Sequence, residues 1–439
     1  MKNRSRTQSL NRRNFLKSLA LTAGVIGFPT IVPSSVLGRG RNVSPSNRLS
    51  VGCLGVGPRG TTDMNGFLEL PEAKVLAVCD AYADRQRKAK DAVDKKYGSE
   101  DCKTYGDFRE VLARRDIDAV MIATQDHWHA LIATAAAKAG KHMYCEKPFG
   151  VSVRDCKVIR DAVRKKKVVF QTGTQQRSDR KFRRACELAL NGYLGKIHTV
   201  EVGSPGPDFK PKYTGSMDPQ PVPEGFDWNT WVGPAPFKPY NPGRVAWPDW
   251  YLIWDYCAGF IVNWGVHHLD IASWGCPEIG AASFDVECQA TYRNEAFTDN
   301  VRGWSSTLNF ASGLKLVYSD NTQCKSGCKF IGDAGWVRAD RPVIEAEPES
   351  LLEIKLKDSD THLRRSASHV VDFIAAIRDG TKPVSDVEAG YKASFLGMTA
   401  DISARLQRKL KWDARKEKFV GADEANAMLA RPLHNGWRL

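Results

Sequence analysis

The sequence predicts an α/β protein that opens with a doubly wound parallel sheet and continues into a domain with antiparallel strands. Near the N-terminus, short apolar runs alternate with polar helical segments, which is the order of parallel strands joined by crossover helices. Around residues 304–318, apolar and polar residues alternate on both sides of Ala311-Ser312-Gly313, the pattern of a hairpin. With 439 residues, the chain is long enough for two domains with full cores.

The first strand and its turn form the clearest motif in the chain. Residues 49–54 are an apolar run, and three glycines follow in the spacing G-x-G-x-x-G: Gly55, Gly57 and Gly60. In a strand–turn–helix unit, the first glycine permits the tight turn and the second admits a pyrophosphate, while the third lets the helix pack closely. We therefore expect a dinucleotide at this turn.

A second strand strengthens that expectation. Residues 74–79 are largely apolar and end at Asp80, which lies 20 residues after Gly60, where a ribose-binding carboxylate belongs. A carboxylate there accepts hydrogen bonds from the ribose hydroxyls and repels a 2′-phosphate. The sequence thus favours NAD, although Arg85 and Lys88 leave room for NADP.

Two further strands end in polar clusters. The strand at 119–124 leads into Gln125-Asp126-His127-Trp128-His129 and a helix over 130–139, and the strand at 141–145 leads into Glu146-Lys147-Pro148. Histidines two positions apart can share a metal ion, but no Cys or carboxylate ligand set accompanies them. Residues after parallel strands more naturally line a cofactor crevice. We therefore expect no metal.

The remaining elements follow from periodicity. An amphipathic helix over 152–167 and a strand over 168–172 end the first domain. The second domain contains further strand-like segments at 196–203, 282–291, 328–332 and 335–339. It also contains a helix with apolar residues at i,i+4 spacing: Met398, Ile402, Leu406 and Leu410. The insert 204–250 has little periodicity. Its tryptophans and Trp254 just beyond it suit either core packing or stacking on sugar rings: Trp228, Trp231, Trp247, Trp250 and Trp254.

Charge and cysteine content limit the function classes. The net charge is +14, but residues 1–50 hold nine Lys and Arg and no acid, which leaves 55 basic against 50 acidic residues in the rest. A nucleic-acid binder keeps its basic surface on the folded part, and the chain shows no DNA- or RNA-binding motif. The eleven cysteines form no zinc-ligand pattern. We expect free thiols, with Cys324–Cys328 as the one optional disulfide.

Residues 1–40 have the features of an export leader. Arg12-Arg13 stands within Asn11–Lys17, a twin-arginine signature, and an apolar stretch over 19–28 follows. A basic amphipathic helix would explain the charges, but not the paired arginines with Phe-Leu-Lys behind them. Twin-arginine export carries folded proteins, so a cofactor would be loaded in the cytoplasm. We expect the twin-arginine machinery as a partner and a periplasmic location.

The motifs together resemble the Gfo/Idh/MocA oxidoreductases, which include glucose–fructose oxidoreductase and inositol dehydrogenases. The resemblance rests on GVGPRG, CD at 79–80, ATQDHWH, EKP at 146–148 and WGVHHLD at 264–270, and stretches at 171–178, 227–244 and 419–432 resemble the twin-arginine-exported branch. It implies a Rossmann domain over 48–174 and a C-terminal α/β domain over 175–439 with a large, open, mostly antiparallel sheet. Because an uncovered sheet face is a liability, we expect a homo-oligomer, either a dimer or a tetramer.

The family's chemistry is hydride transfer between nicotinamide and a carbinol carbon of a sugar or polyol. It uses the Lys of the EKP motif and the Asp and His of a D-x-G-x-H motif, which match Lys147, Asn263 and His267 here. Asn263 stands where the Asp belongs and cannot act as a base. The resemblance implies that His267 accepts the proton of the substrate hydroxyl, and that Lys147 donates to the same oxygen.

The binding residues expected from these motifs form two sets. Those for the cofactor are Gly55, Gly57, Arg59, Gly60, Asp80, Thr124, Asp126, His127, His129, Glu146, Lys147 and Gln175. Those for the substrate are Gln176, Arg177, Trp264, His268 and Arg244. Arg177 suits an interdomain ion pair equally well. The cofactor is expected to stay tightly bound, because free NAD is scarce outside the cytoplasm.

Three functions remain open at this point. The leading one is an exported oxidoreductase whose retained NAD is reduced by one substrate and reoxidised by another. The second is a redox-neutral glycoside hydrolase or lyase, in which transient oxidation beside the glycosidic bond acidifies the neighbouring C–H. The third is a carbohydrate-binding protein without activity, which the retention of Lys147 and His267 disfavours.

Overall fold

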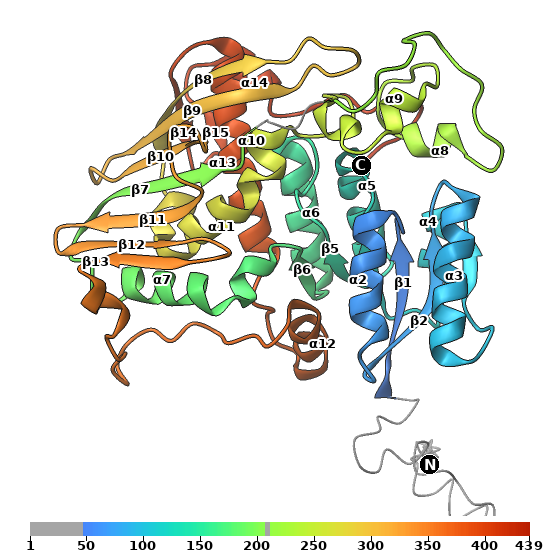
Figure 1. The fold of residues 1–439 in the computed structure, drawn as a ribbon, viewed down its shortest axis with the longest axis horizontal. Helices are drawn as coiled ribbons and strands as arrows, with labels where there is room; N and C mark the ends of the chain where they lie inside the picture. The colour runs from blue at the N-terminus through green and yellow to red at the C-terminus, as the bar shows by residue number, and fades with distance from the viewer. Residues whose placement is uncertain (1–46, 207–210) are drawn as a thin grey trace, which may run out of the picture. The chain divides into compact units, whose positions relative to one another are not determined.

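Residues 49–172 build a parallel sheet whose six described strands run in the order β3-β2-β1-β4-β5-β6 (Figure 1). This computed structural model describes residues 47–206 and 211–439, so the expected leader at 1–40 lies outside the described residues. The strands are β1 Leu49–Leu54, β2 Ala73–Cys79, β3 Lys103–Tyr105, β4 Ala119–Ile122, β5 His142–Cys145 and β6 Phe170–Thr172. The strand order reverses between β1 and β4, where such sheets bind their ligands.

Helices cover both faces of this sheet. One face packs against α2, α3 and α12, with Phe67 and Phe373 in the buried cluster. The other face packs against α4, α5 and α6, with Val111 and Ile159 buried. The bounds are α2 Pro58–Leu68, α3 Ala83–Tyr97, α4 Phe108–Ala113, α5 Asp126–Lys138, α6 Val153–Lys166 and α12 His369–Asp379.

The C-terminal part holds a mixed sheet of nine described strands, in the order β13-β12-β11-β7-β10-β9-β8-β14-β15. Every pairing in it is antiparallel except that of β7 with β10. The strands are β7 Ile197–Ser204, β8 Phe284–Tyr292, β9 Val301–Phe310, β10 Lys315–Asp320, β11 Gly327–Gly332, β12 Gly335–Ala339, β13 Ile344–Glu347, β14 Leu410–Asp413 and β15 Lys418–Phe419. The predicted fold class, a Rossmann sheet followed by a mostly antiparallel sheet, is confirmed.

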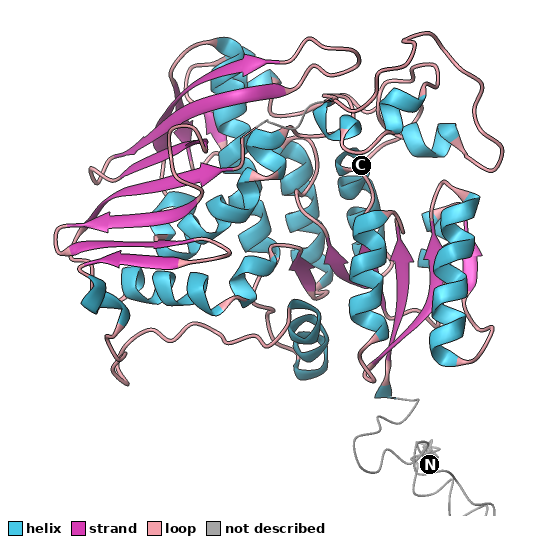
Figure 2. Ribbon diagram, viewed as in Figure 1, coloured by secondary structure: helices cyan, strands magenta, loops and turns pink. Residues whose placement is uncertain are grey.

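Helices α7, α11 and α13 cover one face of the second sheet (Figure 2). Residues of β8 show the difference between its faces: Val286 and Cys288 are buried beneath the helices, whereas Glu287 and Gln289 are exposed. Assembly through the open face stays a prediction. The helices of this part are η2 Gln175–Ser178, α7 Arg180–Leu190, α10 Phe260–Asn263, α11 Gly265–Gly275, η4 Pro277–Gly280, η5 Glu349–Leu352, α13 Val387–Leu406 and α14 Asp423–Ala427.

The insert between β7 and α10 contains short helices around an aromatic cluster. They are α8 Trp228–Val232, α9 Pro242–Val245 and η3 Asp249–Leu252. Trp228 and Trp231 stack with ring centroids 5.1 Å apart and are buried with Tyr240 and Tyr256. Trp247, in contrast, is 53% exposed. The insert's tryptophans therefore include both core residues and residues open to a ligand.

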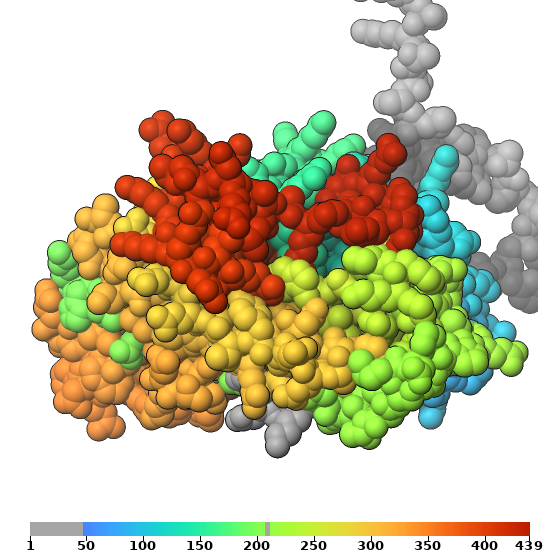
Figure 3. All heavy atoms as spheres, turned by 90° about the horizontal axis from the view of Figure 1, so that it is seen from above, coloured from blue at the N-terminus to red at the C-terminus, as the bar shows by residue number. Residues whose placement is uncertain are grey.

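The last residues of the chain return to this insert and to the first sheet. In Figure 3 the C-terminal segment, in red, lies against the lime-green insert. Asn435 donates from Nδ2 to the carbonyl oxygens of Gly233 and Ala235, at 2.7 and 2.9 Å. The ring of Trp437 meets that of Trp128 on α5 edge-on, with 4.8 Å between centroids. The C-terminal segment thus contacts both the insert and α5.

Two element boundaries differ from those that the sequence predicts, and the structure decides the optional disulfide. Helix α5 begins at Asp126, four residues early, because an acid suits the first turn of a helix. Leu410 begins β14 and does not extend α13, which ends where Gln407 adopts a left-handed conformation (φ 50°). All eleven cysteines are free thiols, Cys324 and Cys328 included. None of the helices in the described ranges is long and apolar enough to cross a membrane.

Candidate active site

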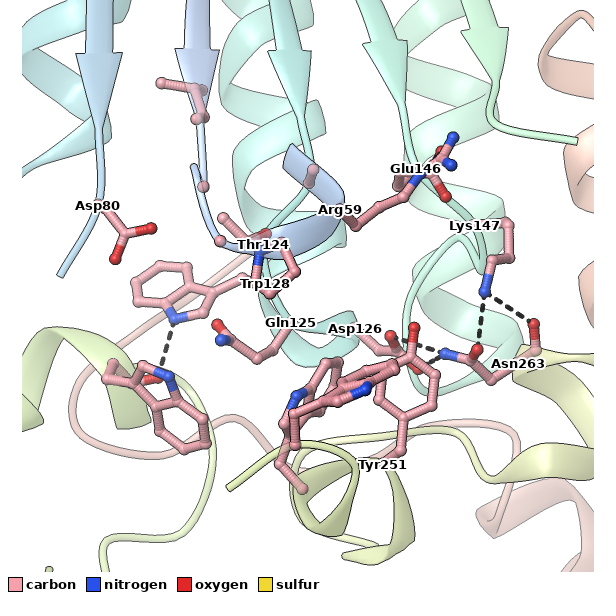
Figure 4. Close-up of a pocket in the computed structure, with 18 of the residues that line it drawn as sticks. Arg59, Asp80, Thr124, Gln125, Asp126, Trp128, Glu146, Lys147, Tyr251 and Asn263 are labelled. Atoms are coloured by element: carbon pink, nitrogen blue, oxygen red, sulfur yellow. Dashed lines mark hydrogen bonds and ion pairs between the residues drawn. The ribbon is translucent and has the colours of Figure 1, made fainter. Parts of the chain in front are cut away.

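A cavity of about 450 Å³ opens at the carboxyl ends of β1, β2, β4 and β5 (Figure 4). Loops of the parallel sheet form one side of it, and the insert, α10 and α11 form the other. The cavity therefore lies where the reversal of strand order predicts a ligand.

The glycine-rich turn forms one wall. Gly55 has a φ of +82°, which favours glycine, and a Cβ there would lie 2.7 Å from the carbonyl carbon of Ala123. A Cβ on Gly60 would lie 1.9 Å from the carbonyl oxygen of Gly55, so only glycine lets α2 pack this closely. Gly57 is the N-cap of α2 and has no capping side chain. The N–H groups of the first helical turn are thus available to an anion such as pyrophosphate.

Asp80 faces the cavity from the end of β2. Its Oδ2 accepts from the Val56 N–H at 2.9 Å, and its Oδ1 accepts from the Tyr82 N–H at 3.0 Å. Burial raises the pKa of this carboxyl, while Arg85, 3.9 Å from Oδ1, and the backbone donors oppose that rise. The carboxylate is therefore anchored in position, with lone pairs left for further donors.

Arg59 connects α2 to the end of β5. Its guanidinium donates to Glu146 Oε1 at 3.1 and 2.8 Å and pairs with Asp63 at 2.8 Å. Burial, together with the charge of Glu146, raises the pKa of Asp63 to about 8. These contacts fix Glu146 immediately before Lys147.

A buried hydrogen-bond chain lies at the other end of the cavity. Lys147 donates from Nζ to Asn263 Oδ1 at 2.8 Å and to the Asn263 carbonyl oxygen at 3.1 Å. Asn263 donates from Nδ2 to the two carboxylate oxygens of Asp126, at 3.0 and 2.9 Å. Burial lowers the pKa of Lys147, and the charges of Glu146 and Asp126 oppose that shift. The asparagine thus connects the lysine to a carboxylate.

His267 lines the same end of the cavity, one helical turn after Asn263. Its ring meets that of Trp264 edge-on at 5.2 Å, and its buried Nδ1 has no hydrogen-bond partner within the described chain. Burial, with the charge of Lys147, lowers the pKa of His267 well below its usual 6.5. The imidazole is therefore neutral at pH 7, the form that accepts a proton.

Two more polar atoms of the cavity wall lack a partner among the described residues. They are the buried Oγ1 of Thr124 and Oε1 of Gln175. Because buried polar groups are normally hydrogen-bonded, these atoms mark places for the polar groups of a ligand. Together with the glycine turn and Asp80, they fit a dinucleotide.

Several residues expected in the site lie outside the cavity. His127 and His129 belong to α5, and their ring nitrogens contact backbone carbonyl oxygens at 2.6 to 3.2 Å. Gly60 packs behind the turn, and Gln176 is buried away from the cavity.

The remaining expected residues in this group form structural contacts. Arg177 donates to both oxygens of the buried Asp270, at 2.8 and 2.7 Å, so it forms an ion pair, but with a residue of the same C-terminal domain and not across the domain junction. A ring nitrogen of His268 lies 2.7 Å from the Gly203 carbonyl oxygen. Arg244 lies over the ring of Phe297 at 4.3 Å.

The cavity also contains residues that no motif singled out. Tyr251 comes from the insert, with the Lys147 ammonium 5.7 Å from its ring centroid. Arg341 comes from the turn between β12 and β13 and lies over Trp264 at 4.7 Å. Phe108 lies near the end that holds Asp80. The aromatic content of the insert signals Tyr251, whereas only the fold brings Arg341 to the site.

Comparisons with known proteins agree with this geometry. A family model described as the NAD-binding Rossmann fold of an oxidoreductase family matches residues 49–174, and one described as the C-terminal alpha/beta domain matches residues 179–439. Myo-inositol 2-dehydrogenase of Thermotoga maritima is 31% identical over 159 residues, which are 36% of this chain and 46% of that protein. A glycosyl hydrolase family 109 protein of Shewanella baltica is 30% identical over 163 residues, covering 34% of this chain and 36% of that protein. Each match thus spans less than half of the relative.

A solved structure matches over a longer range. Scyllo-inositol dehydrogenase from Lactobacillus casei, with bound NAD(H) and scyllo-inositol, superposes with a TM-score of 0.59 at 15% identity, covering 83% of this chain and 99% of that chain. At this identity the likeness shows a shared fold.

Proposed function

Because the chain belongs to the Gfo/Idh/MocA oxidoreductase family, we propose that it is an exported, NAD-dependent oxidoreductase acting on a hydroxyl-bearing carbon of a sugar, glycoside or polyol. One observation carries the proposal. The cavity that holds the glycine turn and Asp80 at one end holds Lys147 and His267 at the other. A single space therefore offers a dinucleotide site together with a proton acceptor and a cation.

Different residues of the cavity would bind the nucleotide, accept the proton and stabilise the charge on the substrate oxygen. Gly55, Gly57, Asp80, Thr124 and Gln175 would hold the nucleotide, which when bound accepts a hydride from the substrate carbon. A neutral histidine on α11 takes the proton of the substrate hydroxyl. The ammonium of the lysine after β5 donates to the same oxygen and stabilises its negative charge. Tyr251 of the insert also lines this end, with its ring centroid 5.7 Å from the Lys147 ammonium.

Native mass spectrometry of the purified protein, followed by product analysis, tests this proposal. We expect a mass increment of one NAD per chain and reduction of the nicotinamide on addition of a substrate from a panel of sugars, glycosides and polyols. A protein that carries no nucleotide, and binds none when NAD is supplied, would contradict the proposal.

A redox-neutral glycoside hydrolase or lyase is the second candidate, favoured by the similarity to the Shewanella baltica protein. The same site would serve it, because a transient keto group acidifies the neighbouring C–H bond. Cleavage of a glycoside without net accumulation of NADH would identify this reaction. Sugar binding with neither cleavage nor reduction would instead identify a binding protein.

We also propose a periplasmic location and a homo-oligomeric state. The twin-arginine signature supports the first, and the open face of the nine-stranded sheet supports the second. The same native mass spectra should give the mass of a dimer or tetramer. A monomer at micromolar concentration would contradict the assembly.

A further inference from the structure

The hydrogen-bond chain of Asp126, Asn263 and Lys147 has a fixed direction. A carboxylate only accepts hydrogen bonds, and an ammonium only donates them. A residue between the two must donate to one and accept from the other, and a side-chain amide does both. Asn263 therefore turns Nδ2 to the Asp126 oxygens, at 3.0 and 2.9 Å, and Oδ1 to Lys147 Nζ, at 2.8 Å (Figure 4).

This direction explains why an amide stands at position 263. An aspartate there would place a second carboxylate against Asp126, at a point where both residues are about 1% exposed. Two buried carboxylates in contact do not both stay ionised. Asn263 and Asp126 thus form one unit, and its negative charge resides on Asp126.

We propose that Asp126 is a positioning residue that acts through Asn263 to orient the Lys147 ammonium and to keep it charged. The catalytic role of the ammonium charge rests on the proposed function, whereas the hydrogen bonds among the three residues do not. Of the three N–H donors of Lys147, two go to Asn263, to its Oδ1 and its carbonyl oxygen. Within the described chain the third has no acceptor, so it remains for a ligand in the cavity.

Other groups around the lysine do not supply the same charge. Glu146 precedes Lys147, but Arg59 binds its carboxylate at 2.8 Å and shares its charge. The other charged or titratable groups near Lys147, apart from Asp126 itself, are Glu146, Arg59, Cys257, His267 and Asp63, together with Tyr251, whose ring centroid lies 5.7 Å from Nζ. Asp126 forms no ion pair with a second cation in the described residues. The Asp126 carboxylate therefore stabilises the Lys147 ammonium through the side-chain amide of Asn263.

A purely structural role is the competing explanation. Asp126 begins α5 and accepts from the Ala258 N–H at 3.2 Å, so its loss also disturbs packing. Asp155 provides a matched control, because it is a buried carboxylate in the first turn of α6 and accepts from the Val151 N–H at 3.0 Å. It does not line the candidate site.

The test measures the pKa of Lys147 in protein without substrate, by ¹³C NMR of lysines labelled at Cε. Lys147→Arg serves to assign the signal. We expect Asp126→Asn to lower the pKa of Lys147 by about one pH unit or more. The basic limb of the rate profile should move to lower pH by the same amount. Asp155→Asn should change neither.

The exchange of Asp126→Asn with Asn263→Asp keeps one amide and one carboxylate, and turns the carboxylate directly to Lys147. We expect this variant to fold and to have a Lys147 pKa at or above the wild-type value, even where the single variant fails to fold. An unchanged pKa in Asp126→Asn, or an exchange variant that is unfolded or has a lower pKa, would overturn the proposal. If the titrations behave as expected and no substrate is oxidised, the proposed function fails and the inference stands.

Discussion

At Asp80, burial and hydrogen bonding act in opposite directions. The residue is 9% exposed, and its burial raises the pKa of the carboxyl. The N–H groups of Val56 and Tyr82 and the charge of Arg85 favour the ionised form. An ionised carboxylate at the end of β2 is the group that would accept hydrogen bonds from a ribose.

Replacing this carboxylate should change the nucleotide preference. A hydrogen bond to a charged group contributes about 1.5–3 kcal/mol, so Asp80→Ala should weaken NAD binding roughly tenfold or more. The preference against NADP should fall as well, because the repulsion of the 2′-phosphate is lost. Calorimetric titration of nucleotide-free protein measures both. Asp84→Ala, on the exposed first turn of α3, is the control, and unchanged NAD affinity in Asp80→Ala would place the ribose elsewhere.

Single residues differ in how far the sequence predicts them. Gly55, Asp80 and Lys147 follow short apolar strands, and the ends of parallel strands meet at one edge. Arg341 lies in a hairpin turn with no motif, so only tertiary structure brings it to the cavity. His127 is expected among the cofactor-binding residues because it follows a parallel strand, but it lies within α5 and its ring nitrogens contact backbone carbonyl oxygens.

Helix α2 depends on Gly60 for its position. A Cβ at this residue would lie 1.9 Å from a backbone oxygen that cannot move without opening the turn. We expect Gly60→Ala to destabilise the protein by about 1–3 kcal/mol, as overpacking does, and to impair NAD binding.

A glycine in the same helix serves as the control. Gly66→Ala meets only a methyl group of Val370 at 3.2 Å, and alanine favours a helix by about 0.5–1 kcal/mol. Urea unfolding and NAD titration of both variants test the comparison. Equal stability and affinity in Gly60→Ala and wild type would contradict the close approach.

Elements were predictable where the sequence pattern has a single interpretation. Five strands of the parallel sheet are short apolar runs, and the structure has them at nearly the same residues. The sixth, β3, is the largely exposed Lys103–Tyr105, which has no apolar run and was not predicted. Leu410 continues the spacing of the α13 stripe, yet Gln407 ends that helix and Leu410 starts a strand. The insert has no period, so its aromatic cluster and its contact with the C-terminal segment are visible only in three dimensions.

Across the whole molecule, buried histidines make stability depend on pH. Burial lowers the pKa of His127 and of His268 to about 4, and it lowers the pKa of His267 well below its usual value. Below pH 6.5 the unfolded chain binds protons at these sites and the folded chain does not, so stability falls as the pH drops toward 4. Burial lowers the pKa of His142 and His369 as well, which adds to this effect. Buried carboxyls with a raised pKa act in the opposite sense, among them Asp63, with a pKa of about 8, Asp80 and Asp155.

Urea unfolding between pH 4.5 and 6.5 tests this balance. We expect a lower free energy of unfolding at pH 4.5 than at pH 6.5. His127→Gln should reduce the slope by up to about 1.4 kcal/mol per pH unit, which corresponds to one proton. His362→Gln, at an exposed histidine, should leave the slope unchanged. An identical slope in His127→Gln would contradict a neutral, buried imidazole.

The proposed export would concern the chain as a whole, because the twin-arginine route carries folded proteins. Replacing Arg12→Lys together with Arg13→Lys should leave the precursor in the cytoplasm, folded and loaded with nucleotide. Fractionation of cells and mass spectrometry of the retained precursor measure both properties. Normal export of the double variant would contradict the interpretation of residues 1–40 as a twin-arginine leader.

The central claim is that Lys147 and His267 act on a substrate oxygen beside a bound nicotinamide. Its most direct test is the single-turnover absorbance change of the bound nicotinamide after mixing with an active sugar or polyol. We predict that Lys147→Ala slows this reduction by about 10²–10³-fold and His267→Ala by about 10²–10⁴-fold, with the nucleotide retained in both. Reduction at the wild-type rate in both variants would contradict the account.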